Sequence, residues 1–119
     1  MPRTTEDLQD FCRTLAGTTE DVKWGHHLVF SVGGKMFAIF DLPDNGKIRF
    51  KVEPLLFSSL VEQDGIEPSP YLARQHWVFL EDRKALPTET LKDLLSDAHA
   101  LVAAKLSKKK QRELGLLDE

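Results

Sequence analysis

The sequence has only one cysteine, Cys12, so no disulfide can form within the chain. It has no apolar run near the roughly 18 residues that a membrane-spanning helix requires. The first residues, MPRTTEDLQDF, lack the apolar segment of a secretory signal. These absences predict a soluble, cytoplasmic protein of bacterial type, with no membrane partner. Cys12 itself falls on the apolar side of a helical pattern, which predicts a buried residue without a chemical role.

Motifs for catalysis and for cofactors are also missing. The chain has no Gly-x-Ser-x-Gly, His-Glu-x-x-His, Cys/His metal quartet or glycine-rich dinucleotide fingerprint. Gly33-Gly34-Lys35 resembles the end of a phosphate-binding loop, but Met36 follows where Ser or Thr is needed. His26 and His27 are adjacent, so on a strand they point to opposite faces and cannot readily grip one ion. We therefore expect no enzyme, no cofactor and no metal site.

The length and composition are those of one globular domain spanning residues 1–119. Of these 119 residues, 41% are hydrophobic, which is enough for a core of useful size. Apolar residues at helical spacing predict helices near the N-terminus, from residue 54, and from about residue 88. Runs rich in Val, Ile and Phe predict strands within residues 28–52, and shorter strands are expected at residues 18–24 and 76–80. The expected fold is α+β, with an antiparallel sheet of about five strands packed against helices.

The chain is organised around residues 28–52, LVFSVGGKMFAIFDLPDNGKIRFKV, which we interpret as a three-strand meander. Its last run alternates cleanly, so one face should be apolar and the other basic. The apolar set is Ile48, Phe50 and Val52, and the basic set is Lys47, Arg49 and Lys51. The whole chain has a net charge of −3, yet residues 23–52 carry five basic and two acidic residues. The meander is therefore the one basic tract apart from the lysine-rich tail.

Three other features each permit two interpretations. Trp77 is either an aromatic core residue or a base-stacking platform. The cations of residues 107–112, SKKKQR, either complement the end of the last helix or contact phosphate. The leucines that follow, Leu114, Leu116 and Leu117, either fold back onto the core or meet a second subunit. No heptad pattern predicts an oligomer, so we expect a monomer.

Several short motifs occur in an order that resembles the MmcQ/YjbR-like family over nearly the whole chain. They are Trp24-Gly25, Gly34-Lys35-Met36-Phe37-Ala38, Phe50-Lys51-Val52-Glu53-Pro54, Pro68-Ser69-Pro70-Tyr71-Leu72-Ala73-Arg74, His76-Trp77-Val78 and Lys105-Leu106-Ser107-Lys108-Lys109. The resemblance implies a small α+β domain with a double-wing fold, whose hairpins project as wings. It also implies a DNA-binding role, which rests on fold similarity alone. The resemblance carries no catalytic residue.

Two functional hypotheses follow. In the first, the protein is a weak DNA-binding module whose basic strand residues neutralise phosphates. The cations concerned are Lys35, Lys47, Arg49, Lys51 and Arg74. In the second, it binds a small molecule or a protein in an aromatic cleft over the sheet, lined by Trp24, Tyr71 and Trp77, without a nucleic-acid role. The two differ in whether the strand cations form an unshielded patch or are paired with acids.

Overall fold

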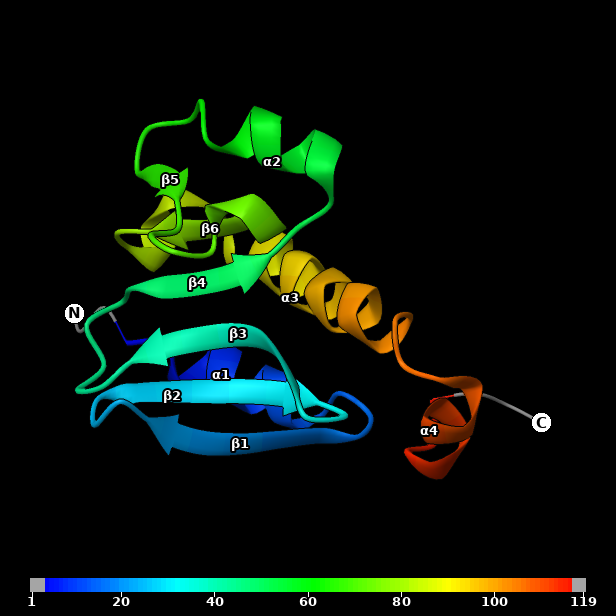
Figure 1. Ribbon diagram of the computed structural model, residues 1–119. Coiled ribbons are helices and arrows are strands. Elements are labelled where there is room, and N and C mark those ends of the chain that lie inside the picture. The colour runs from blue at the N-terminus through cyan, green and yellow to red at the C-terminus, as the bar shows by residue number, and fades with distance from the viewer. Residues whose placement is uncertain (1–3, 117–119) are drawn as a thin grey trace.

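The computed structural model describes residues 4–116 as one six-stranded antiparallel sheet with helices. The strand order is β1-β2-β3-β4-β6-β5, and every neighbouring pair is antiparallel. The strands are β1 (Thr18–Lys23), β2 (His27–Val32), β3 (Lys35–Asp41), β4 (Ile48–Lys51), β5 (Ile66–Pro68) and β6 (Trp77–Leu80). The first four follow one another as a meander (Figure 1). The predicted α+β class and antiparallel sheet are thus confirmed.

The helices lie mainly on one side of this sheet. They are α1 (Glu6–Arg13), α2 (Pro54–Leu60), α3 (Thr88–Ala103) and α4 (Lys108–Glu113), with short 3-10 turns η1 (Ala73–Gln75) and η2 (Arg83–Ala85). Figure 1 shows α1 and α3 behind the sheet, while α2 lies beyond its β5–β6 end. We call the side that α1 and α3 do not cover the helix-free face. None of the helices within residues 4–116 has the length and apolar character needed to cross a bilayer.

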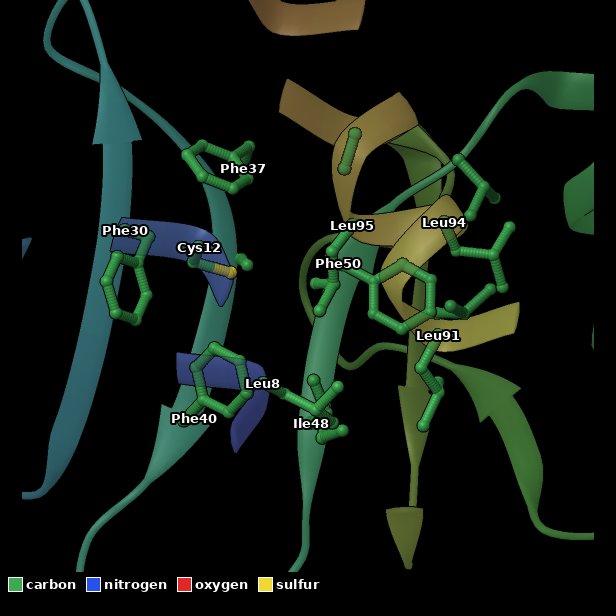
Figure 2. Close-up of a cluster of buried hydrophobic side chains, with 14 of the residues drawn as sticks. Leu8, Cys12, Phe30, Phe37, Phe40, Ile48, Phe50, Leu91, Leu94 and Leu95 are labelled. Carbon is green, nitrogen blue, oxygen red and sulfur yellow. The ribbon is translucent and has the colours of Figure 1, made fainter. Parts of the chain in front are cut away.

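The main core lies between the sheet and the helices α1 and α3. It contains Phe30, Phe37, Phe40, Ile48 and Phe50 from the strands, and Leu8, Cys12, Leu91 and Leu95 from the helices, all fully buried (Figure 2). Burial of this apolar area is the main force that holds the layers together. The expected alternation in residues 48–52 is confirmed, because Ile48 and Phe50 point into this core whereas Arg49 and Lys51 are only half-buried.

A smaller apolar cluster lies on the helix-free face. Val29, Ile39 and Trp77 are nearly fully buried there, and Met36 and Leu72 pack against them. Residues 69–76 form the loop that covers this cluster, and backbone hydrogen bonds tie the loop to β6 and β4. Ser69 N–H donates to Trp77 O at 3.0 Å, and Val52 N–H donates to His76 O at 2.9 Å. Trp77 is therefore a packed residue of this second cluster, 2% exposed.

The start of α1 is held by a turn that is distant in sequence. The backbone N–H of Thr5 donates to a carboxylate oxygen of Asp44 at 2.6 Å, and the Thr5 hydroxyl donates to the same oxygen at 3.1 Å. Asp44 precedes β4, so it supplies from 39 residues away the negative charge that a helix N-terminus favours. The side chain of Thr5, the residue that precedes α1, accepts no capping hydrogen bond from the backbone of the helix.

Two details differ from the sequence-based expectation. The sheet has a sixth strand, β5, in a segment for which no strand was predicted, because three residues are enough to pair with β6 despite Pro68 at the end. The cations of residues 107–112 do not lie at the C-terminal end of α3. Instead α3 ends at Ala103, and the Ser107 hydroxyl accepts from Lys110 N–H at 3.1 Å and caps a new helix, α4. Leu114 and Leu116 pack on the core, and Leu117 lies outside the described residues.

Candidate functional site

A hollow of about 360 Å³ opens on the helix-free face. Its lining residues come from the β1–β2 turn, three central strands and the covering loop: Trp24, His27, Met36, Ile39, Arg49, Pro70, Tyr71 and Leu72. We call it the aromatic hollow. Its walls are mainly apolar, and its volume lies in the lower part of the range for small-molecule sites. Side chains on rigid strands thus form the floor, while two turns form the rim.

The rim carries two large aromatic side chains that remain in solvent. Trp24 is 61% exposed and Tyr71 is fully exposed. Both lie at positive φ, 55° and 68°, in the left-handed region that bulky residues rarely adopt. Such strain persists only where the surrounding structure enforces it, and it is concentrated at functional sites. The Trp24 ring also makes an edge contact with His27 at 5.8 Å between centroids, which helps to fix its orientation.

The loop places Tyr71 through its own hydrogen bonds. Leu72 N–H donates to Ser69 O at 3.1 Å, and Trp77 N–H donates back to Leu72 O at 3.3 Å. Leu72 is thereby fixed against the smaller apolar cluster, with Tyr71 turned outward at the preceding position. The burial of Leu72 and the exposure of Tyr71 are two results of one local conformation.

The polar part of the aromatic hollow is a network around Asp41. Arg49 donates to the Asp41 carboxylate at 2.8 Å, and its guanidinium carbon lies 4.6 Å from the centre of the Phe79 ring. His27 Nε2 lies 3.5 Å from the same carboxylate oxygen. Burial raises the pKa of Asp41, but hydrogen bonds from Arg49 and Asn45 outweigh it, so the pKa falls below its usual value. Asp41 is therefore ionised at neutral pH and holds Arg49.

His27 is neutral under the same conditions. Its burial, with smaller contributions from Arg49 and His26, lowers the pKa of His27 despite the opposing charge of Asp41. Its Nδ1 atom is buried and finds no hydrogen-bond partner in the described part of the chain, residues 4–116. A second proton on the ring would thus add a charge in a poorly solvated position. The hollow offers one neutral imidazole and one paired guanidinium to a ligand.

The five cations predicted to contact phosphate do not form one patch. Arg49 lines the aromatic hollow, while Lys35 and Lys51 line a second, neighbouring hollow. Lys47, which precedes β4, lines neither hollow. Arg74, which is exposed on η1, also lines neither of them. Sequence alternation predicted the shared face of Arg49 and Lys51 correctly. It gave no indication that Asp41 neutralises one of them.

The aromatic cleft predicted from the sequence is brought together in part. Trp24 and Tyr71 line the aromatic hollow. Trp77 is instead buried in the smaller apolar cluster and lines the neighbouring hollow. Sequence reasoning missed His27, Met36, Ile39 and Leu72 as lining residues. Their signal was the alternation of the strands, which places Ile39 and His27 opposite the core. Within residues 4–116, no three His, Cys, Asp or Glu side chains gather where a metal ion could bind.

Comparison with solved structures finds proteins of the same fold. A Deinococcus radiodurans protein described as having a DUF419 domain is 30% identical, with a TM-score of 0.86, over 98% of this chain and 91% of that one. A Pseudomonas syringae protein is 23% identical, with a TM-score of 0.65, over 82% of this chain and 97% of its own, which shows the same fold. No curated protein matches the chain.

The match to a family model agrees with the first of these structures. The YjbR model covers residues 13–101, from the end of α1 through most of α3, and so includes the whole sheet and both sides of the aromatic hollow. The resemblance inferred from the short motifs is thereby confirmed, and this chain belongs to the YjbR family.

Proposed function

We propose that this protein is a binding module that takes a planar, largely apolar group into the aromatic hollow, between Trp24 and Tyr71. The observation that carries the proposal is the pair of solvent-exposed aromatic side chains at strained positive φ, on the rim of a hollow with an apolar floor. A ligand that covered these two rings would remove their apolar surface from water, which favours binding. A planar group would stack on these rings and rest on Ile39, Met36 and Leu72.

The polar residues of the hollow suit a ligand with a few hydrogen-bonding atoms at its edge. Neutral His27 can donate or accept, depending on its tautomer, and Arg49 keeps donors beyond the one used on Asp41. The pairing of Arg49 with Asp41 favours this role over duplex DNA binding through the strand cations, because that cation is already engaged. We propose that the protein performs this role as a cytoplasmic monomer without catalytic activity.

The proposal is tested with N-phenyl-1-naphthylamine, a neutral planar dye whose fluorescence rises in apolar sites. We expect saturable binding by the wild-type protein, with energy transfer from tryptophan to the dye. Trp24→Ala and Tyr71→Ala should each weaken binding about fivefold or more, since stacking on one aromatic ring contributes about 1 kcal/mol or more. Alanine retains a Cβ at positive φ, so each variant keeps the backbone strain and removes only the ring.

The matched control is Leu55→Ala, which removes an apolar side chain that is 89% exposed on α2 and does not line the aromatic hollow. We expect its dye affinity to equal that of the wild type. Absence of dye binding by the folded wild-type protein would overturn the proposal. Equal binding by wild type, Trp24→Ala and Tyr71→Ala would also overturn it, because the dye would then lie elsewhere.

A further inference from the structure

A second hollow of about 260 Å³ lies beside the first, at the end of the sheet where β3 begins and β4 ends. Its lining is Lys35, Met36, Lys51, Gln75, Trp77, Val102 and Lys105. We call it the lysine hollow. Met36 lines both hollows, so they adjoin on one continuous surface. Figure 1 shows the C-terminal end of α3 near this end of the sheet, which is how Lys105 reaches it.

Three cations gather here from three separate elements. Lys35 begins β3, Lys51 ends β4, and Lys105 follows the last turn of α3. No carboxylate belongs to the lining, and no ion pair within residues 4–116 involves any of the three lysines. Complementing the α3 dipole accounts for Lys105 alone. It does not explain why Lys35 and Lys51 face the same hollow.

Lys51 is the best-placed of the three. Its ammonium group donates to the backbone carbonyl of Gln75 at 2.7 Å, which fixes its position and leaves two further N–H donors. Burial and then the nearby charge of Lys105 lower the pKa of Lys51. Like charges held together in this way repel one another, and an anion placed between them would relieve the repulsion. Lys51 is thus already in position for a negative group, with Lys35 and Lys105 beside it in the lining.

We propose that the ligand of the helix-free face carries a phosphate group, which Lys35, Lys51 and Lys105 bind in the lysine hollow next to the planar group in the aromatic hollow. For the planar group this inference rests on the proposed function. A multiply charged anion matches three ammonium groups, and lysine binds phosphate as a point charge. A planar ring joined to a phosphate is the chemistry of a nucleotide, either free or within a single strand of nucleic acid.

The experiment compares adenosine, AMP and a single strand of six deoxyadenylate nucleotides by isothermal titration calorimetry. We expect AMP to bind at least about tenfold more tightly than adenosine, because the phosphate adds charge-assisted contacts. The double variant Lys51→Gln, Lys105→Gln should lose this gain while its affinity for adenosine stays unchanged. The matched control is Lys108→Gln, Lys109→Gln, which removes the same charge from α4, outside the lysine hollow, and should keep the gain.

The other arms identify the source of the phosphate. A strand that binds no more tightly than AMP supports a free nucleotide, whereas a strand that binds more tightly and with steep salt dependence supports single-stranded nucleic acid. Equal affinity for adenosine and AMP overturns the inference. Failure of AMP to bind overturns it as well, and so does an equal loss in the two double variants, since net charge alone would then be responsible.

A titration with inorganic pyrophosphate separates this inference from the proposed function. Changes in the NMR amide signals of residues 35, 51 and 105 support the phosphate site even if the neutral dye fails to bind. If the dye binds but pyrophosphate leaves these signals unchanged in the wild-type protein, the aromatic hollow stands and the phosphate site is overturned.

Discussion

The guanidinium group of Arg49 donates a hydrogen bond of 2.8 Å to the carboxylate of Asp41, which lies on the neighbouring strand β3, diagonally across from Arg49 and two residues beyond its register partner Ile39. The same guanidinium lies over the ring of Phe79. One of the cations that the sequence offers to a nucleic acid therefore has two partners within the protein. The helix-free face therefore carries a hollow whose polar edge is already paired within the protein.

We expect Arg49 and Asp41 to be energetically coupled. Their side chains are 21% and 16% exposed, so water screens the pair only in part. A double-mutant cycle with Asp41→Asn and Arg49→Gln should give a coupling free energy of about 1 kcal/mol in urea unfolding. Additive effects of the two substitutions would show that the pair contributes nothing to stability.

Duplex DNA binding should be insensitive to Arg49. Removing a residue that neutralises a phosphate reduces the slope of log affinity against log salt concentration by about 1. Because Asp41 already neutralises Arg49, we expect Arg49→Ala to leave that slope unchanged in anisotropy titrations of a labelled mixed-sequence duplex at about 50 and 200 mM salt. Arg74→Ala, which removes an exposed cation, serves as the comparison. A shallower slope for Arg49→Ala would favour the hypothesis that Arg49 contacts DNA phosphates.

Stability should fall as the pH is lowered through the ordinary pKa of histidine, in part because of His27. Burial lowers the pKa of folded His27, so the unfolded chain binds its proton at a higher pH than the folded chain does. Acid therefore favours unfolding across that interval. We expect His27→Gln to reduce the pH dependence of the free energy of unfolding between about pH 7 and pH 5. His26→Gln, which alters an exposed ring and leaves His27 able to titrate, should retain it.

The two glycines of the β2–β3 turn should respond differently to alanine. Both have positive φ, 62° at Gly33 and 83° at Gly34, so either substitution incurs backbone strain of about 1 kcal/mol. A Cβ at Gly33 would also lie 2.6 Å from a methyl carbon of Leu106, whereas one at Gly34 would meet nothing within 4 Å. We expect Gly33→Ala to cost about 1 kcal/mol more than Gly34→Ala.

Thermal unfolding measures this difference, and a second substitution identifies its cause. Adding Leu106→Ala to each variant removes the methyl groups that a Cβ at residue 33 would strike. The difference between the two turn variants should then disappear. If it persists without Leu106, contact with that side chain is not its cause.

Cys12 should be inert in the folded protein. It is fully buried, and burial raises the pKa of its thiol to about 12, so almost no thiolate exists near neutral pH. We expect Ellman's reagent to react with the thiol only as fast as the protein unfolds. In guanidinium chloride the reaction should be complete within seconds to minutes. Rapid reaction under native conditions would mean that α1 separates from the sheet locally.

The sequence predicted most accurately the parts of the fold that depend on local pattern. Alternation in residues 48–52 sorted core from surface, and Pro54 marked the start of α2. Alternation failed in β3, where a shift in its register against β2, between Phe30 and Ser31, lets both Phe37 and Ala38 face the core. A single extra residue in a strand leaves no clear signal in the sequence.

The site was harder to predict because it depends on long-range contacts. Trp24 and Tyr71 were identified as aromatic candidates, but nothing local reveals that a covering loop brings residue 71 to the β1–β2 turn. The pairing of Arg49 depends on the register of β3 against β4, and the lysine hollow joins residues 35, 51 and 105. Charge counts along the chain describe composition, whereas binding depends on which charges become neighbours.

The hydrogen bond from Thr5 to Asp44 couples the start of α1 to the β3–β4 connection in the middle of the chain. A helix of eight residues has little stability of its own, so its N-terminal turn depends on a carboxylate that arrives only when the β3–β4 connection is formed. Opening that connection would release both segments together as one cooperative unit. In amide hydrogen exchange, the Thr5 N–H should therefore be protected to the same extent as the turn before β4, although Thr5 precedes the first turn of α1.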